Sequence, residues 1–151
     1  VVLIRHGREA GVPAEPERVG TLARIRDFDR GTDGLLNIVA HGERRFEIVS
    51  RSVRPDGLQI GQVELLPEPV AVAVPARHAS LATLLRDALP RLPPPWNALP
   101  DRADDADWLG GRLAVLLPLD LHTRQALLET TDPLERLATL ATLLEGAGRR
   151  S

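Results

Sequence analysis

Residues 19–66 alternate apolar side chains with arginine, aspartate and glutamate at nearly every second position. A period of two is typical of strands in a sheet that buries one face and exposes the other. Asp-Gly pairs at 33–34 and 56–57 interrupt this alternation, and glycine readily adopts the positive φ that a tight hairpin needs. With a further turn at residues 40–42, the segment is predicted to form four short strands.

The apolar positions also predict which face of this sheet points inward. One face of the first strand carries Val19, Thr21, Ala23 and Ile25. The strand after the first turn carries Leu36 and Ile38 on the same face. Phe46 and Ile48 continue this face. The alternation changes phase at residues 61–62, which predicts a β-bulge there. Because bulges bend strands, we expect the sheet to curl into a small antiparallel barrel.

Two flanking segments are expected to join the sheet. Residues 1–4 are continuously apolar, which is typical of a strand buried on both faces. Val70, Val72 and Val74 lie among prolines and are expected to form an edge strand at most. We therefore expect a barrel-like subdomain over residues 1–70, followed by a helical subdomain over residues 71–151.

The second half of the chain carries helical periodicity and four predicted helices. Apolar residues from Leu81 to Leu89 follow the spacing of an amphipathic helix that ends near Pro90. An aspartate is expected to cap the start of each of the other three helices. One helix runs from Asp104 or Asp105 to near Pro118, the next from Asp120 to near Leu128, and the last from Asp132 to near Gly146. This half is predicted to be a small helical bundle.

A proline-rich segment, residues 90–101, separates the first two predicted helices and carries Trp96 and Leu99. Three consecutive prolines exclude a helix, so the segment is predicted to be a stiff loop. An aromatic side chain on a rigid loop can anchor an apolar partner segment at little entropic cost. The alternative is that Trp96 folds back onto its own bundle.

Composition excludes several functions. Cysteine is absent, which excludes disulfides and thiolate chemistry and is typical of a cytoplasmic protein. All 19 basic residues are arginine, so there is no Walker A lysine, Schiff-base lysine or Ser-Lys dyad. No apolar run approaches the roughly 18 residues of a membrane span. The missing methionine at position 1 predicts that the sequence starts inside a longer gene product.

No catalytic or metal-binding arrangement stands out. The four histidines lack ligand spacing and are expected on the surface or in turns: His6, His41, His78 and His122. Acidic clusters at 27–33 and 101–107 are explained by a hairpin turn and a helix start. We therefore expect no enzyme activity, metal or cofactor.

Arg44 and Arg45 are the candidate polar binding residues of the first half. With Arg51 and Arg54 they are one possible phosphate-facing surface, as in barrel modules that bind RNA. Only 3% of residues are aromatic and the formal net charge is −2, so a solvated arginine face is favoured over a nucleic-acid site.

Short motifs in both halves resemble one family. The sheet half is similar to the N-terminal, substrate-binding domain of Lon proteases in Val19-Gly20-Thr21, Asp33-Gly34 and Gly42-x-Arg44-Arg45-Phe46-x-Ile48. The helical half resembles the same family in Trp108-Leu109, Leu116-Leu117-Pro118-Leu119, Gln125-x-Leu127-Leu128-Glu129 and Asp132-Pro133-x-x-Arg136-Leu137. The resemblance implies an α+β fold, with a PUA-like barrel followed by a helical bundle.

The same resemblance implies a non-catalytic module that binds exposed apolar or unfolded protein segments, or a partner protein. The alternative is an RNA-binding PUA-like barrel that uses its arginine face. The sequence departs from the family pattern by lacking its opening strands and first helix, and the ATPase and Ser-Lys peptidase modules. It also places Gly110-Gly111 where a good helix former is expected.

Overall fold

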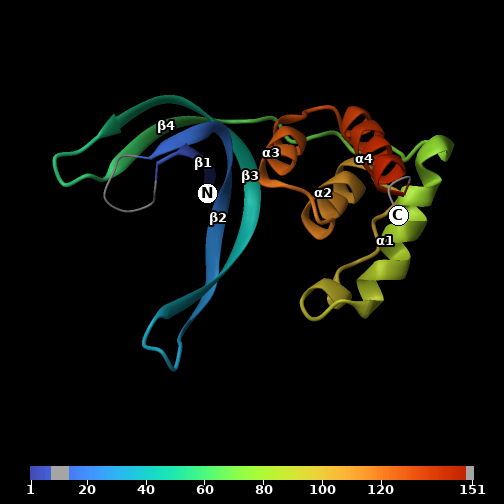
Figure 1. The fold of residues 1–151 in the computed structure, drawn as a ribbon, viewed down its shortest axis with the longest axis horizontal. Coiled ribbons are helices and arrows are strands. Elements are labelled where there is room, and N and C mark those ends of the chain that lie inside the picture. The colour runs from blue at the N-terminus through green and yellow to red at the C-terminus, as the bar shows by residue number, and fades with distance from the viewer. Residues whose placement is uncertain (8–13, 149–151) are drawn as a thin grey trace. The chain divides into compact units, whose positions relative to one another are not determined.

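The computed structural model describes residues 1–7 and 14–148. The chain forms two compact units, Val1–Glu68 and Pro69–Ser151, which we call the sheet unit and the helical unit. Within the described residues, the sheet unit contains four strands and the helical unit four α-helices (Figure 1). This α+β arrangement confirms the predicted fold class. Within the described residues, no helix is long and apolar enough to cross a membrane.

The sheet unit is one antiparallel sheet with strand order β1-β2-β3-β4. Its strands are β1 (Val2–His6), β2 (Glu15–Arg30), β3 (Leu36–Val53) and β4 (Gln59–Leu65). The sheet is strongly bent (Figure 1), and β1 and β4 are its edges. The prediction that residues 1–4 are buried on both faces is wrong, because β1 is a half-buried edge strand and Val1 is 80% exposed.

No turn forms at residues 40–42, which pair with β2 inside the long strand β3 next to a bulge, so residues 19–66 hold three strands rather than four. In the β2–β3 ladder Thr21 pairs with Arg45 and Ala23 with Gly42, which leaves one extra residue on β3. Gly42 lacks the positive φ of the hairpin glycines. Glycine here marks an irregularity in the ladder and not a chain reversal.

The bulge predicted at residues 61–62 lies on the neighbouring strand. Ile48 pairs with Val63 and Ser50 with Gln62, so Val49 of β3 is the extra residue. The sequence thus located the irregular part of the ladder but assigned it to the wrong strand.

Both predicted Asp-Gly hairpin turns are confirmed. Gly34 and Gly57 have φ of 82° and 84°. Their N–H groups donate to the carbonyls of Gly31 and Arg54, each at 2.9 Å. The aspartate before each glycine accepts the N–H two residues further on, at 3.0 and 3.1 Å. The two hairpins therefore share one turn geometry, a turn closed by a left-handed glycine.

The predicted inward face is buried only near the base of the β2–β3 hairpin. Phe46 is 6% exposed, whereas Ile25, Leu36 and Ile38 are 53–66% exposed. The reason is topological, because β1 pairs with β2 only up to Gly20 and β4 pairs with β3 only from residue 46 onward. Residues 22–42 therefore form a two-stranded arm, which Figure 1 shows extending past the other two strands.

The helical unit contains the predicted helices, α1 (Ala79–Ala88), α2 (Ala106–Leu116), α3 (Leu121–Glu129) and α4 (Pro133–Gly148). Short 3₁₀ turns lie at Ala76–His78, Leu89–Arg91 and Trp96–Ala98. Asp105 and Asp120 cap α2 and α3 by accepting N–H groups at 3.1 and 2.8 Å. Gly146 does not end α4. The buried core is built mainly from leucine: Leu81, Leu85, Leu89, Leu109, Leu113, Leu127, Leu137 and Leu140, with Ala82, Ala103 and Ala106.

The valines at 70, 72 and 74 do not form an edge strand of the sheet. The segment instead makes one isolated bridge, between Ala73 and Asp105. Val74 N–H donates to the Asp104 carbonyl at 3.0 Å, and the carbonyl of Val72 accepts the N–H of residue 106 at 2.8 Å. Prolines on both sides prevent a longer ladder, so these bonds fasten the segment to the start of α2.

Candidate binding site

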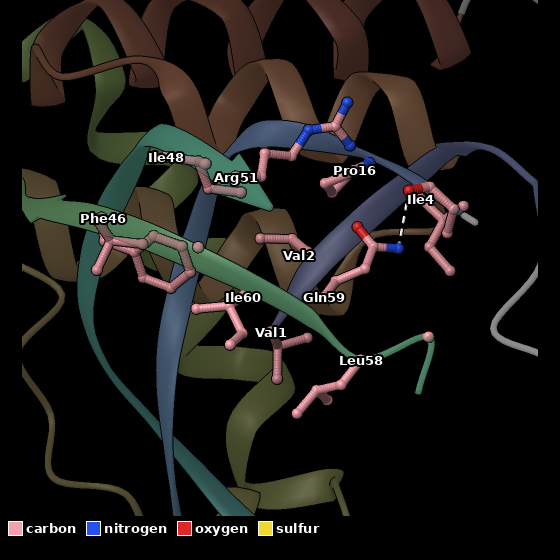
Figure 2. Close-up of a pocket in the computed structure, with 14 residues that line it drawn as sticks. Val1, Val2, Ile4, Pro16, Phe46, Ile48, Arg51, Leu58, Gln59 and Ile60 are labelled. Atoms are coloured by element: carbon pink, nitrogen blue, oxygen red, sulfur yellow. Dashed lines mark hydrogen bonds between the residues drawn. The ribbon is translucent and has the colours of Figure 1, made fainter. Parts of the chain in front are cut away.

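The sheet unit carries a hollow of about 520 Å³ that residues of both edge strands line (Figure 2). β1 contributes Val2 and Ile4, and β4 contributes Ile60 and Val63. Phe46 and Ile48 line it from β3, so the bent sheet brings β1, β3 and β4 around one space. The lining also includes Val1, Ala14, Pro16, Arg51, Gly57, Leu58, Gln59 and Gly61.

The chemistry of this hollow is that of an apolar binding site. Arg51 is the charged side chain of its lining, and Gln59 donates through Nε2 to the Ala14 carbonyl at 2.9 Å (Figure 2). Across residues 1–7 and 14–148, no group of three or more His, Asp or Glu side chains is placed to hold a metal ion. Within the described residues, β1 and β4 are the edges of the sheet, the position at which an added strand would pair.

Arg44 and Arg45 lie near the end of the β4 strand. Arg44 donates through Nη2 to the Leu66 carbonyl at 3.1 Å and lies 3.5 Å from a Glu68 carboxylate oxygen. The Arg45 carbonyl accepts the Leu66 N–H at 2.9 Å, and its side chain is half-buried. These bonds tie β3 to the segment that leaves the sheet.

Other arginines of the sheet unit pair with glutamates across strands. Arg18 Nη2 lies 2.7 Å from Glu47 Oε1, and Arg24 Nε lies 2.6 Å from Glu43 Oε1. Arg5 binds both carboxylate oxygens of Glu17. Since much of the arginine charge is neutralised locally, the RNA-binding alternative is not favoured.

Trp96 and Leu99 belong to the helical unit and differ in their packing. Leu99 is half-buried against the leucine core. Trp96 begins a 3₁₀ turn, and its backbone N–H donates to the Pro93 carbonyl at 3.1 Å. Its side chain is half-buried but is not part of the core cluster. Trp96 is therefore the freer of the two side chains.

Two features of the structure differ from what the sequence predicts. Residues 1–4 were expected to form a strand buried on both faces, whereas Val2 and Ile4 of β1 line an open hollow together with Ile60 and Val63 of β4. His78, expected on the surface or in a turn, lies in the 3₁₀ turn that leads into α1 but is only 6% exposed, and its Nε2 accepts from Arg77 Nε at 3.2 Å.

The family model and the relative that match this chain belong to the same family. Residues 1–146 match the family model for the ATP-dependent protease La (LON) substrate-binding domain. Lon protease of Phenylobacterium zucineum (strain HLK1) is 31% identical over 138 residues, which cover 87% of this chain and 17% of that protein. The chain thus spans about a sixth of this relative.

Two solved structures resemble this fold. The Lon N-terminal domain protein from Xanthomonas campestris superposes with a TM-score of 0.72 at 37% identity, over 84% of this chain and 68% of that one. The N-terminal domain of Mycobacterium avium complex Lon protease gives a TM-score of 0.57 at 23% identity, over 83% of this chain and 69% of that one. The second likeness concerns the fold alone.

Proposed function

Because this chain belongs to the family of Lon substrate-binding domains, we propose that it is a non-catalytic module that binds exposed apolar or unfolded segments of proteins. The family supports the role of a substrate-binding module. The observation that carries the finer proposal is the apolar hollow, which residues of both edge strands of the sheet line.

An extended segment suits this hollow for two reasons. Alternate apolar side chains of the segment bury against Ile60, Val63 and Val2, at about 25 cal/mol for each Å² removed from water. Its backbone pairs with an edge strand, which makes binding tolerant of sequence. A folded protein keeps its apolar residues and backbone groups occupied, so the proposed site selects unfolded chain.

Four residues remain predicted contributors to binding, namely Trp96, Leu99, Arg44 and Arg45. Of these, Trp96 fits the role best because it is a large aromatic side chain outside the core cluster. The arginines have partners within the sheet unit and are expected to contribute less.

The test compares two isoleucines of the sheet unit. Ile60 lines the hollow and is 47% exposed, whereas Ile38 lies on the β2–β3 arm and is 53% exposed. We expect Ile60→Arg to weaken binding of a fluorescent, leucine- and valine-rich twelve-residue peptide about tenfold, because a buried charge opposes apolar contact. The matched Ile38→Arg variant keeps its affinity within about twofold, as is usual for surface changes. Fluorescence anisotropy measures both, and equal affinities in the two variants would contradict this site.

A further inference from the structure

Arg51 supplies the charged side chain in the lining of the hollow (Figure 2). The lining around it is apolar, apart from glycine and Gln59, whose amide is bound to the Ala14 carbonyl. No aspartate or glutamate is among the described residues that line this space. All of the lining residues belong to the sheet unit, so any preference that Arg51 gives to the hollow arises within this unit.

The bulge in β3 brings Arg51 to the face of the sheet that borders the hollow. Ile48 pairs with Val63 and Arg51 with Gly61, and between these pairs β3 has two residues where β4 has one. Cross-strand partners lie on the same face, so Arg51 shares the face of Ile48 and Val63, both of which line the hollow. Without the extra residue, Val49, alternation along β3 would turn Arg51 to the opposite face. The irregularity therefore places one charge beside apolar side chains.

Arg51 is accessible to a ligand in the hollow. Its side chain is exposed, and its cross-strand partner Gly61 has no side chain that could cover it. A Cβ on Gly61 would have its nearest neighbours at 3.9 Å, so the space on this side of Arg51 is open. A segment in the hollow can therefore contact Arg51 and the apolar residues together.

The charge of Arg51 is not neutralised by the sheet unit. Within residues 1–7 and 14–148, its guanidinium has no ion-pair or hydrogen-bond partner. Other arginines of the unit are paired: Arg18 Nη2 lies 2.7 Å from Glu47, and Arg54 Nη2 lies 3.2 Å from Asp56. An apolar segment that covers this surface displaces water from Arg51, which is unfavourable unless the segment also supplies an acceptor.

We propose that the hollow prefers apolar segments that carry an aspartate or glutamate side chain, and that Arg51 selects for this carboxylate. The inference rests on the proposed function and names its substrate class more closely. A guanidinium matches the geometry of a carboxylate, and a lysine in the same place is repelled. Because Arg51 shares a face with the apolar lining, the acidic side chain belongs on the same face of the extended segment as its apolar residues.

The test uses fluorescent, leucine- and valine-rich peptides with blocked ends and one Glu, Gln or Lys on the apolar face. We expect the unmodified chain to bind the Glu peptide about three- to fivefold tighter than the Gln peptide, as for an ion pair that stays in contact with water. The Lys peptide binds more weakly than both. Fluorescence anisotropy measures all three affinities.

Variants assign this preference to one residue. Arg51→Gln is expected to remove it, and Arg51→Glu to reverse it in favour of the Lys peptide. Arg26 is the matched control, because it is an exposed arginine of the β2–β3 arm with no ion pair among the described residues, and it does not line the hollow. Arg26→Glu keeps the order of the unmodified chain.

A second measurement needs no variant. Raising sodium chloride to about 0.5 M is expected to reduce the advantage of the Glu peptide over the Gln peptide, because salt screens exposed charges. An advantage that is unchanged by salt would contradict an ionic contact.

The outcomes separate this inference from the proposed function. If the Glu and Gln peptides bind equally, the preference for a carboxylate is wrong while apolar capture stands. If no peptide binds, the proposed function fails and the preference fails with it. A preference that survives in Arg51→Gln would overturn the role of Arg51. A Gln peptide whose free C-terminus gives it the affinity of the Glu peptide would overturn the assignment to a side chain.

Discussion

Arg136 shows how one residue organises the helical unit. It is 4% exposed, and its guanidinium binds Asp107 on α2, the Leu127 carbonyl at 3.0 Å and the Thr130 carbonyl at 2.5 Å. Each of its three nitrogens thus donates to an acceptor on α2 or at the end of α3. A buried guanidinium satisfied in this way sets the relative position of three helices, since moving any helix leaves a buried charge without its bonds.

Gly110 lies close to the Arg136 side chain, and the adjacent Gly111 provides a control. A Cβ on Gly110 would lie 3.1 Å from Arg136 Cδ, whereas a Cβ on Gly111 would meet nothing within 4 Å. We expect Gly111→Ala to raise the free energy of unfolding by about 0.5–1 kcal/mol through helix propensity. Gly110→Ala lowers it, because the pinned Arg136 must shift. Urea unfolding followed by tryptophan fluorescence measures both, and equal changes in the two variants would disprove the close approach.

At the scale of elements, the two hairpins show that the turn and the neighbouring strands determine different properties, namely the register and the burial of the strands. Both reverse the chain at an Asp-Gly pair with the same hydrogen bonds. The strands that they join differ in how far they pair with neighbouring strands. The β2–β3 arm extends beyond its neighbours, whereas β4 pairs with β3 along most of its length. Turn chemistry therefore determines register, and the neighbouring strands determine burial.

Gly57 and Gly61 test the role of the turn glycine within one hairpin. Gly57 has a φ of 84°, and Gly61 has ordinary backbone with 3.9 Å to the nearest atom from its would-be Cβ. Gly57→Ala is expected to destabilise the β3–β4 hairpin by about 1–2 kcal/mol, because a left-handed conformation strains alanine. Gly61→Ala stays neutral or stabilises, since alanine loses less entropy than glycine in a strand. Amide hydrogen exchange of residues 46–65 reports both, and similar protection in the two variants would argue against the turn.

At the scale of the whole molecule, burial is unequal between the units. Among the buried apolar residues of 1–7 and 14–148, Phe46 belongs to the sheet unit and the rest to the helical unit. The sheet unit instead exposes many large apolar residues, among them Phe28 at 70% and Leu58 at 54%. Opening of a segment is easiest where few apolar contacts are lost.

We therefore expect the sheet unit to open before the helical unit. Amides of β2, β3 and β4 should exchange at least about tenfold faster than those of α2 and α4, as is usual for segments with little buried area. Hydrogen exchange measured by mass spectrometry resolves the two units in one experiment. A tightly bound apolar peptide should slow exchange in β4 and leave α4 unchanged. Uniform protection along the chain would contradict this difference in stability.

Local chemistry determined much of this protein from the sequence alone. Aspartate caps, helical leucine spacing and Asp-Gly turns act within a few residues, so the helices, both hairpins, the fold class and the family were predicted correctly. Only the tertiary structure decided which strand carries each bulge, that the arm is exposed, and that an apolar hollow opens beside both sheet edges. These features depend on how far the neighbouring strands extend and on contacts between residues that are distant in the sequence. The alternation of apolar and polar residues along one strand predicts neither.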